Sequence, residues 1–349
     1  MASVLNALLG DAFDIVSMTQ AINILPVQQL TIGQMGMFPF QGVDTDTVQI
    51  EYKQGIVTLL PFGALGSLGG GLNDPTRIVR AFPVRNIPVA TTIMAHQLIG
   101  VRKFGSTNQM ETVNERISEE LAAHRAAHEQ TWESHRASAL CGKVNDAVSG
   151  ANLMNMFTEF GISEDTYTFD FSAVPGFEDD PEPEANLQAK CREVKDAVGT
   201  AAGGTGICEV GALIDDTFFN NMMKSYGVRQ AWQQAQNGYD LRTKGSDPNT
   251  FVFTWGGISW ARYRTAIGAN NFFGGTNVAR FYPMGTAATG IFQHFGAPGD
   301  SMAAVNTIGL PMYASQEVLP HDKGVQIHTS SRPFMVCKRP GTLKKGTSI

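Results

Sequence analysis

The chain is poor in charged residues and lacks the short motifs that bind phosphate groups. Charged residues make up 17% of its 349 residues, against roughly 25% in a typical soluble domain. It has no GxGxxG and no GxxxxGK[ST] pattern, and the glycine-rich stretch 61–72 runs into Asn73-Asp74-Pro75 rather than into a helix. Phosphate binding by such a loop needs the following helix N-terminus. The sequence therefore argues against a nucleotide-binding enzyme.

Metal, membrane and nucleic-acid signals are scarce as well. The four cysteines form no CxxC pair, which indicates neither a zinc site nor a redox pair. We expect no secretion signal at the N-terminus and no membrane span, because no apolar run reaches about 18 residues. A net charge of −6 with scattered Lys and Arg argues against a protein that coats nucleic acid. Low charge with 37 glycines and 21 phenylalanines suits a protein that covers much of its surface with copies of itself.

One long stretch, between Gly105 and Gly142, contains neither glycine nor proline. It is rich in Ala, Glu, Arg and Leu, which favour helices. Asn108 is placed to cap its start, and Gly142 is placed to end it in the left-handed conformation. The sequence predicts a helix over 109–141, about 50 Å long at 1.5 Å per residue.

The two sides of this predicted helix differ in character. Glutamates occupy one side, and we expect that side to face solvent or a neighbouring molecule. The opposite stripe, which we expect to pack on a sheet, consists of Val113, Ile117, Leu121, His124, His128, Trp132, His135 and Ala139. His124 and His128 are one turn apart and could share a metal ion. His135 lies about 10 Å farther along the axis and no HExxH is present, so packing is the favoured interpretation.

An extended ribbon is predicted before the helix. Residues 47–52 and 56–60 have the residue pattern of strands. Residues 61–72 form a glycine-rich loop, and a further extended run covers 77–94. Pro83 and Pro88 restrict that last run to edge or bulged pairing. A two-stranded ribbon is marginal alone, so we expect it to rest on something else. For residues 1–40 we expect an arm that packs on a neighbour, with a frayed terminus as the alternative.

The second half of the chain mixes helices and hairpins. We expect an acidic stretch at 178–184 to be a solvated link rather than a Ca²⁺ site, and Gly257–Ala261 to be a hairpin strand, because it falls short of GxSxG. The pattern indicates an α+β fold rather than a regular parallel α/β sheet. We predict short strands beside the long helix at 143–148, 153–157 and 166–171, helices at 187–198 and 216–235, a hairpin at 251–255 and 258–263, and strands at 206–214, 278–282, 290–295, 326–329 and 334–338.

Several segments, in order along the chain, resemble the phage major capsid protein E family. They are RNIPVATTIMAHQLIGVRKFG (85–105), ALCG (139–142), NMFTEFGIS (155–163), NVARFYPMG (277–285), APGDSMAAVNTIG (297–309) and HTSSRPFMVCKR (328–339). The resemblance implies the HK97-like capsid fold. It divides the chain into an N-terminal arm (1–47), an extended E-loop hairpin (48–92), a peripheral domain with a spine helix at about 109–141 (93–184), an axial domain (185–315), and closing peripheral strands with a polar tail (316–349).

The function implied by this resemblance is that of the major head protein of a tailed bacteriophage. Such subunits assemble with themselves, as hexamers and pentamers, into an icosahedral shell around the DNA genome, in the cytoplasm of the host bacterium. A separate scaffolding protein, a portal and a decoration protein are the further partners to expect, without a membrane. Two alternatives stay open: an encapsulin-like compartment, and a metal-dependent α+β enzyme that uses His124, His128 and the acidic loop.

No catalytic, cofactor-binding or metal residues are expected in a shell subunit. The expected sites are instead contacts between subunits, on the ribbon and on the glutamate side of the long helix. These candidate assembly residues are Gly63, Leu65, Leu68, Arg77, Arg80, Glu115, Glu119, Glu129 and Glu133.

Overall fold

The computed structural model describes residues 15–25, 30–53, 77–99, 113–171, 182–203, 209–242, 252–263, 266–267, 270–271, 275–285 and 290–349. The chain forms two compact units, each assembled from segments that are distant in sequence. The first unit consists of Met1–Gln49, Ala81–Ser134 and Gln293–Met335, and the second of Ile50–Arg80, His135–Phe292 and Val336–Ile349.

The long helix is the element that the sequence predicts best. It is α5, Val113–Leu140, with 28 residues. Asn108 and residues 109–112 lie outside the described residues. Gly142 follows the helix with φ +65°, and a Cβ there would lie 2.4 Å from the Phe157 ring. Both the left-handed backbone and the crowded space require glycine at this position, which confirms the predicted end.

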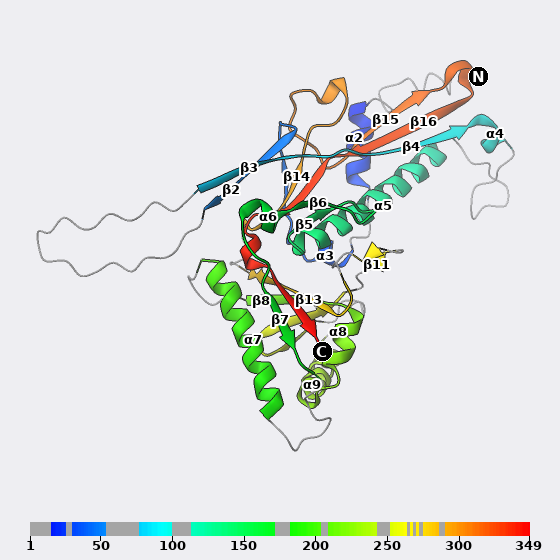
Figure 1. Cartoon of the computed structure of the whole chain (residues 1–349). Coiled ribbons are helices and arrows are strands. Elements are labelled where there is room, and N and C mark those ends of the chain that lie inside the picture. Colours follow the sequence, from blue (N-terminus) through cyan, green and yellow to red (C-terminus); the bar gives the residue numbers. More distant parts are fainter. Residues whose placement is uncertain are drawn as a thin grey trace, which may run out of the picture. The chain divides into compact units, whose positions relative to one another are not determined.

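A three-stranded antiparallel sheet runs along α5 in the first unit (Figure 1). Its strands are β15 (Tyr313–Val318), β16 (Gly324–Ser331) and β4 (Ile87–Met94), with β16 in the centre. β4 is an edge strand, as Pro88 led us to expect, because a central strand needs every N–H in its ladder. Its pairing with β16 also corrects the predicted ribbon, because residues 87–94 belong to this sheet rather than to a free hairpin.

The N-terminal segment contacts its own unit, and the predicted contact with a neighbouring molecule stays a prediction. Helix α2 (Ile15–Ile24) packs on β15, and Thr19 exchanges two hydrogen bonds with the backbone of Ala314, at 3.3 and 3.2 Å. Met18 and Ile22 are buried there. Farther on, α3 (Thr31–Gln34) precedes a small sheet in which β1 (Phe40–Gly42) is parallel to β14 (Phe292–Gly296), with β17 (Pro333–Cys337) on its other side.

The ribbon is confirmed in its described part. β2 (Thr47–Lys53) pairs with β3 (Arg77–Pro83) as a two-stranded sheet. The strand predicted at 56–60 and the glycine-rich loop 61–72 lie outside the described residues. Short elements flank α5 in the sequence. They are α4 (Ala95–Leu98) before it and β5 (Lys143–Asn145), β6 (Asn152–Asn155) and α6 (Met156–Phe160) after it.

The second unit is built on a six-stranded mixed sheet with the order β7-β18-β13-β8-β10-β9. Its strands are β7 (Thr166–Phe169), β18 (Lys344–Ser348), β13 (Val278–Met284), β8 (Glu209–Ile214), β10 (Ile258–Arg262) and β9 (Val252–Trp255). A cluster of aromatic rings, including Phe169, Phe218, Trp260 and Phe281, fills its core in stacked and edge-on pairs. This core supplies most of the apolar burial that holds the unit together.

Three helices belong to this unit: α7 (Glu182–Ala201), α8 (Asp216–Met222) and α9 (Tyr226–Arg242). Two sequence predictions need correction here. The single helix predicted at 216–235 is divided by a turn between α8 and α9, and α7 begins within the stretch that was expected to be an acidic link. In addition, the strand predicted at 153–157 ends at Asn155, whose side chain accepts a hydrogen bond from Phe157 N and caps α6.

The β9–β10 hairpin is confirmed. Gly256 and Gly257 connect the strands with φ +61° and +76°, the pair of positive angles that a two-residue hairpin loop requires. A Cβ on Gly256 would lie 2.7 Å from the Cβ of Cys191 on α7. Ser259 sits within β10, so Gly257–Ala261 is a strand and not a nucleophile elbow.

The C-terminal residues are an inner strand rather than a polar tail, which corrects the sequence prediction. β18 is antiparallel to β13 on one side and parallel to β7 on the other. Lys344 is buried and its Nζ lies 2.5 Å from Asp165 Oδ2. The polar residues near the C-terminus are therefore compatible with an inner strand, because Lys344 has an acidic partner in the same unit.

Deletion of residues 344–349 is expected to unfold the second unit, because β7 and β13 would lose the backbone partners that β18 provides. We expect little soluble subunit and no cooperative unfolding transition by circular dichroism. The variant Lys345→Ala, which keeps the strand, serves as the control. A truncated subunit with an unchanged unfolding midpoint would contradict the inner-strand assignment.

Candidate functional site

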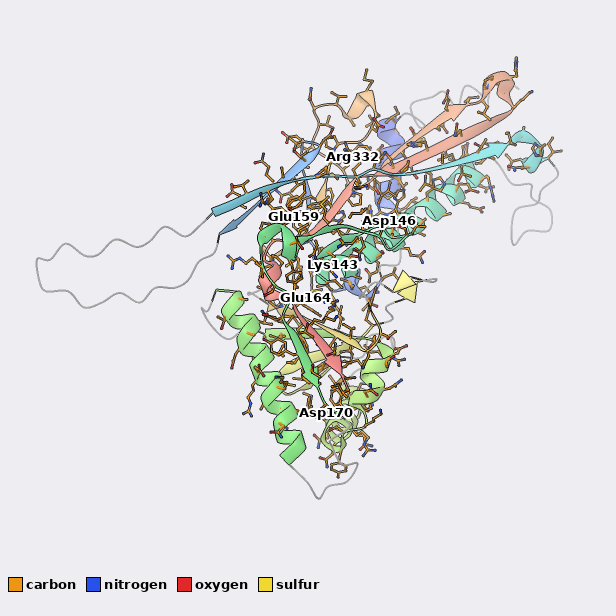
Figure 2. All side chains as sticks on the ribbon, viewed as in Figure 1. Lys143, Asp146, Glu159, Glu164, Asp170 and Arg332 are labelled. Carbon is orange, nitrogen blue, oxygen red and sulfur yellow. The ribbon has the colours of Figure 1, made fainter. Side chains whose placement is uncertain are left out.

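Arg332 fastens the base of the ribbon in the first unit (Figure 2). Its Nη1 donates to Asp46 Oδ1 at 2.7 Å and to the Pro298 carbonyl at 2.9 Å, while Nη2 donates to the Val84 carbonyl at 3.3 Å. Asp46 precedes β2 and Val84 follows β3, and Val84 N donates to the Asp46 carbonyl at 2.9 Å. One planar guanidinium group thus holds both ends of the ribbon, an arrangement that a single lysine cannot reproduce.

The ribbon changes character from its base outwards. Near the base, Phe82 is buried and stacks on Phe334 with ring centroids 5.7 Å apart. Two residues earlier along β3, Arg80 is exposed, and its Nε donates to the Glu159 carbonyl at 3.2 Å. Val79 is exposed as well. The described ribbon therefore has a packed base and an outer part that presents apolar and basic side chains.

A seam of buried histidines and hydroxyl groups joins α5 to strands β4 and β16. His124 Nε2 is 2.7 Å from Thr91 Oγ1, and its Nδ1 is 3.0 Å from Thr329 Oγ1. His128 Nδ1 is 2.9 Å from Ser331 Oγ. Both rings are buried, and so are Thr329 and Ser331. The expectation that these histidines are packing residues is confirmed, because hydroxyl groups occupy the ring nitrogens that a metal ion would need.

Burial makes these rings poor bases. It lowers the pKa of His124, and it lowers the pKa of His128 to about 4, with the charges of His124 and Arg125 acting in the same direction. A charged imidazolium would lose its hydrating water, and the neutral hydroxyl groups around the rings compensate only part of that loss. The seam is therefore neutral at pH 7 and depends on hydrogen bonds rather than on charge.

Glu133 links α5 to the N-terminal segment. Its carboxylate accepts hydrogen bonds from Ile32 N at 2.7 Å and from Gly33 N at 3.0 Å, in the first turn of α3. The side chain is fully buried, and Glu129 one turn earlier is buried too. This corrects the expectation that the glutamate side of the helix faces solvent or a neighbour along its whole length. The exposed part of that side is limited to the N-terminal half of α5.

The described residues offer no site of another kind. Within the described ranges, no group of three or more His, Cys, Asp or Glu side chains could hold a metal ion. None of the helices in the described part of the chain is long and apolar enough to cross a membrane. The remaining features of the described residues are exposed surfaces and the long helix α5, and the exposed surfaces suit contacts between molecules.

Comparison with known families identifies the kind of protein to which these features belong. A family model described as phage major capsid protein E matches residues 14–348. The chain belongs to the phage major capsid protein E family. Its function is that of a phage shell protein, and its helices and mixed sheets form the α+β capsid fold.

Two curated relatives share nearly the whole length of this capsid protein. The major capsid protein of Salmonella phage Felix O1 is 24% identical over 366 aligned residues, which cover 95% of each chain. The major capsid protein of Pseudomonas phage KPP10 is 23% identical, with 97% of each chain covered. Similarity along the full length at this level supports a shared architecture rather than a shared fragment.

Solved structures show the same fold at much lower sequence identity. A prophage protein of E. coli CFT073 superposes with a TM-score of 0.58 at 9% identity, covering 96% of this chain and 99% of that one. The capsid of Ralstonia phage GP4 gives 0.52 at 7% identity, with 86% and 82% covered. The capsid of cyanophage P-SCSP1u gives 0.50 at 11% identity, with 93% and 90% covered.

The structure separates the candidate assembly residues of this capsid protein into three groups. Gly63, Leu65 and Leu68 lie outside the described residues, and Arg77 lies on β3, with its side chain outside the described part. Exposed or half-exposed are Arg80, Glu115 and Glu119, of which Glu119 lies 3.7 Å from Arg116. Glu129 and Glu133 are buried within the subunit, where they cannot touch a neighbour.

Sequence reasoning missed Arg332 and the loop 299–311. Arg332 follows β16 and has no motif around it, so only the fold reveals that Asp46, Val84 and Pro298 converge on it. The sequence does carry one signal for the loop, because residues 301–312 contain no charged residue. That absence is unusual for a loop on the surface of a capsid protein.

Substitution Glu133→Gln is expected to lower the free energy of unfolding of the capsid subunit by roughly 1.5–3 kcal/mol, because one of two charge-assisted hydrogen bonds loses its acceptor. Urea unfolding at pH 7 measures the change. The matched control is Glu119→Gln on the exposed part of the same helix, with an expected change within about 0.5 kcal/mol. Equal effects of the two substitutions would refute the role of Glu133 in holding α3.

Acid is expected to weaken the histidine seam. The pKa of His128 in the folded subunit, about 4, lies below its value in the unfolded chain. Its contribution to the free energy of unfolding is therefore complete above pH 6.5 and is lost as pH falls towards 4. Between pH 7.5 and 4.5 this loss amounts to roughly 2–3 kcal/mol. The difference between the unfolding free energies at pH 7.5 and 4.5 should be smaller in His128→Gln than in the wild type, by this amount. His96→Gln, which changes an exposed ring, is the control. An unaltered pH dependence in His128→Gln would show that the seam does not titrate.

Proposed function

We propose that this chain is the major head protein of a tailed bacteriophage and assembles with copies of itself, as hexamers and pentamers, into an icosahedral shell around the DNA genome. The family match over residues 14–348 carries the proposal. The absence of a basic cluster fits the role, because a chain with a net charge of −6 encloses DNA without binding it tightly.

The parts of the subunit are assigned on the same basis. We assign α5 as the spine helix of a peripheral domain, the ribbon from 48 onwards as the E-loop, and 185–292 as the main part of the axial domain, because residues 293–335 belong to the first unit. Besides this bound, two others differ from those expected from sequence. The ribbon ends at Pro83, where β3 ends, and residues 344–348 go with the six-stranded sheet, because β18 pairs with β13 and β7.

The proposed role of the ribbon is to lie on a neighbouring subunit. A two-stranded sheet is marginal in water. Arg332 and Phe82 fix the base, whereas Val79 and Arg80 are exposed farther out. Between the two strands, residues 55–72 carry no charge and include the candidate contacts Gly63, Leu65 and Leu68. Many modest contacts of this kind let misplaced subunits dissociate before the shell closes.

Other partners are proposed from the role itself. A closed shell that fills with DNA needs a portal, and a separate scaffolding protein would direct its curvature. A decoration protein would bind the outside of the finished particle. Assembly would take place in the cytoplasm of the host bacterium, and the protein would end in the virion capsid.

Deletion of Gly63–Gly71 is expected to leave a folded, soluble subunit that no longer forms shells, because the contact with the neighbour is removed while the base of the ribbon remains. Light scattering and negative-stain microscopy, with the scaffold present, measure assembly. Replacement of the same nine residues by a glycine–serine linker separates length from apolar contact, since only the side chains are lost. Normal shells from both variants would refute the proposed role of this segment, and a wild-type protein that stays monomeric with its scaffold would refute the shell function.

A further inference from the structure

The loop 299–311 of the first unit presents a concentrated apolar surface. Met302 is 93% exposed, Ile308 70%, Val305 57% and Leu310 44%, and Phe40 on the adjacent strand β1 is 40% exposed. We call these five residues the apolar knob. The other large apolar residues exposed in the described part of the chain are spread over distant segments. Single exposed apolar residues are ordinary, but a contiguous group marks an interaction surface.

The knob belongs to one continuous surface. The side chain of Ile308 reaches Gly42 at the end of β1, where an added Cβ would lie 2.5 Å from Ile308 Cγ2. The Phe40 ring and the Leu310 carbonyl both lie over Gly296 of β14, where an added Cβ would be 2.6 and 3.3 Å away. Glycine at these positions lets the loop lie directly on the small sheet.

Hydrogen bonds hold the loop in a fixed shape. The turn η3 (Met302–Ala304) is closed by Ala304 N, which donates to the Ser301 carbonyl at 2.9 Å. Gly309 N donates to the Val43 carbonyl at 2.8 Å, and Leu310 N donates to Tyr313 Oη at 2.8 Å. The backbone that carries the apolar side chains is therefore already ordered, so covering them costs little backbone entropy.

The charge pattern indicates what covers the knob. Residues 301–312 contain no Lys, Arg, Asp or Glu. DNA is a poor fit, because phosphate groups require basic partners. A matching partner should itself be apolar and uncharged, and the sequence contains such a stretch: residues 55–72 carry no charge and include Ile56, Leu60, Phe62, Leu65 and Leu68.

We propose that the apolar knob is a contact between copies of this chain, covered by a second copy in the assembled particle. The loop that carries most of the knob follows Pro298, whose carbonyl is held by the same Arg332 that fastens the base of the ribbon. It is thus continuous with the surface already assigned to assembly. This inference rests on the proposed shell function, which brings copies side by side, and it adds a contact surface that the ribbon alone does not provide.

The first test identifies the neighbour directly. A photoreactive amino acid replaces Met302, and particles are assembled from equal amounts of ¹⁴N- and ¹⁵N-labelled subunits that carry it. After irradiation, mass spectrometry is expected to find cross-linked peptides that join one light and one heavy copy. Cross-links within single copies only, or to another protein only, would overturn the proposal.

The second test measures the energetic role of the knob. In the double variant Met302→Glu with Val305→Glu, two charges would have to be buried on assembly, so the yield of particles should fall roughly tenfold or more. The melting temperature of the free subunit should stay unchanged, because both side chains are exposed in it. Val148→Glu, an apolar-to-acidic change at an 84% exposed site of the second unit, is the control and should assemble like the wild type.

These experiments distinguish a failure of the knob contact from a failure of the shell function. If wild-type shells form and the knob variant assembles equally well, the knob is not a subunit contact, while the shell function stands. If wild-type protein with its scaffold forms no particles, the shell function fails and this inference fails with it. Loss of assembly in the knob variant alone, with the control intact, supports both.

Discussion

The first unit depends on one contact, the packing of helix α5 on strands β4 and β16 through buried polar groups. Helix length alone would not fix the position of α5, because apolar side chains tolerate sliding along a sheet. The hydroxyl groups of Thr91, Thr329 and Ser331 meet the ring nitrogens of His124 and His128 in one register only. A shift by one turn would leave several buried polar atoms without partners, at a cost of about 1–3 kcal/mol each. The seam therefore sets the register of the helix on its sheet.

From this contact the other features of the first unit follow. Glu133 continues the polar side of α5 and holds the first turn of α3, so the N-terminal segment is tied to the same helix. β16 ends at Ser331, and the next residue, Arg332, fastens the base of the ribbon and Pro298, the residue before the loop 299–311. A subunit that must meet several neighbours benefits from such a rigid frame, because ordered contact surfaces lose little entropy when they are covered.

Some features could be predicted from the residues because local chemistry determines them. The absence of glycine and proline over 106–141 gave the long helix, Gly142 gave its end, and Gly256-Gly257 gave the hairpin. The packing role of His124 and His128 followed from their place on an apolar stripe. The assembly residues were harder to predict, because exposure of a glutamate on a helix depends on what covers that helix. Glu129 and Glu133 were placed on the surface for this reason.

The sequence by itself determined the α+β class, the long helix, the paired ribbon strands and, through ordered resemblance, the capsid family. The tertiary structure alone decided that residues 344–348 form an inner strand, that β4 pairs with β16, and that Arg332 and the loop 299–311 share one surface. The physical reason is sequence separation. Helices and tight turns are fixed by interactions within a few residues, whereas strand partners and ion pairs such as Lys344–Asp165 join residues that are far apart in the chain.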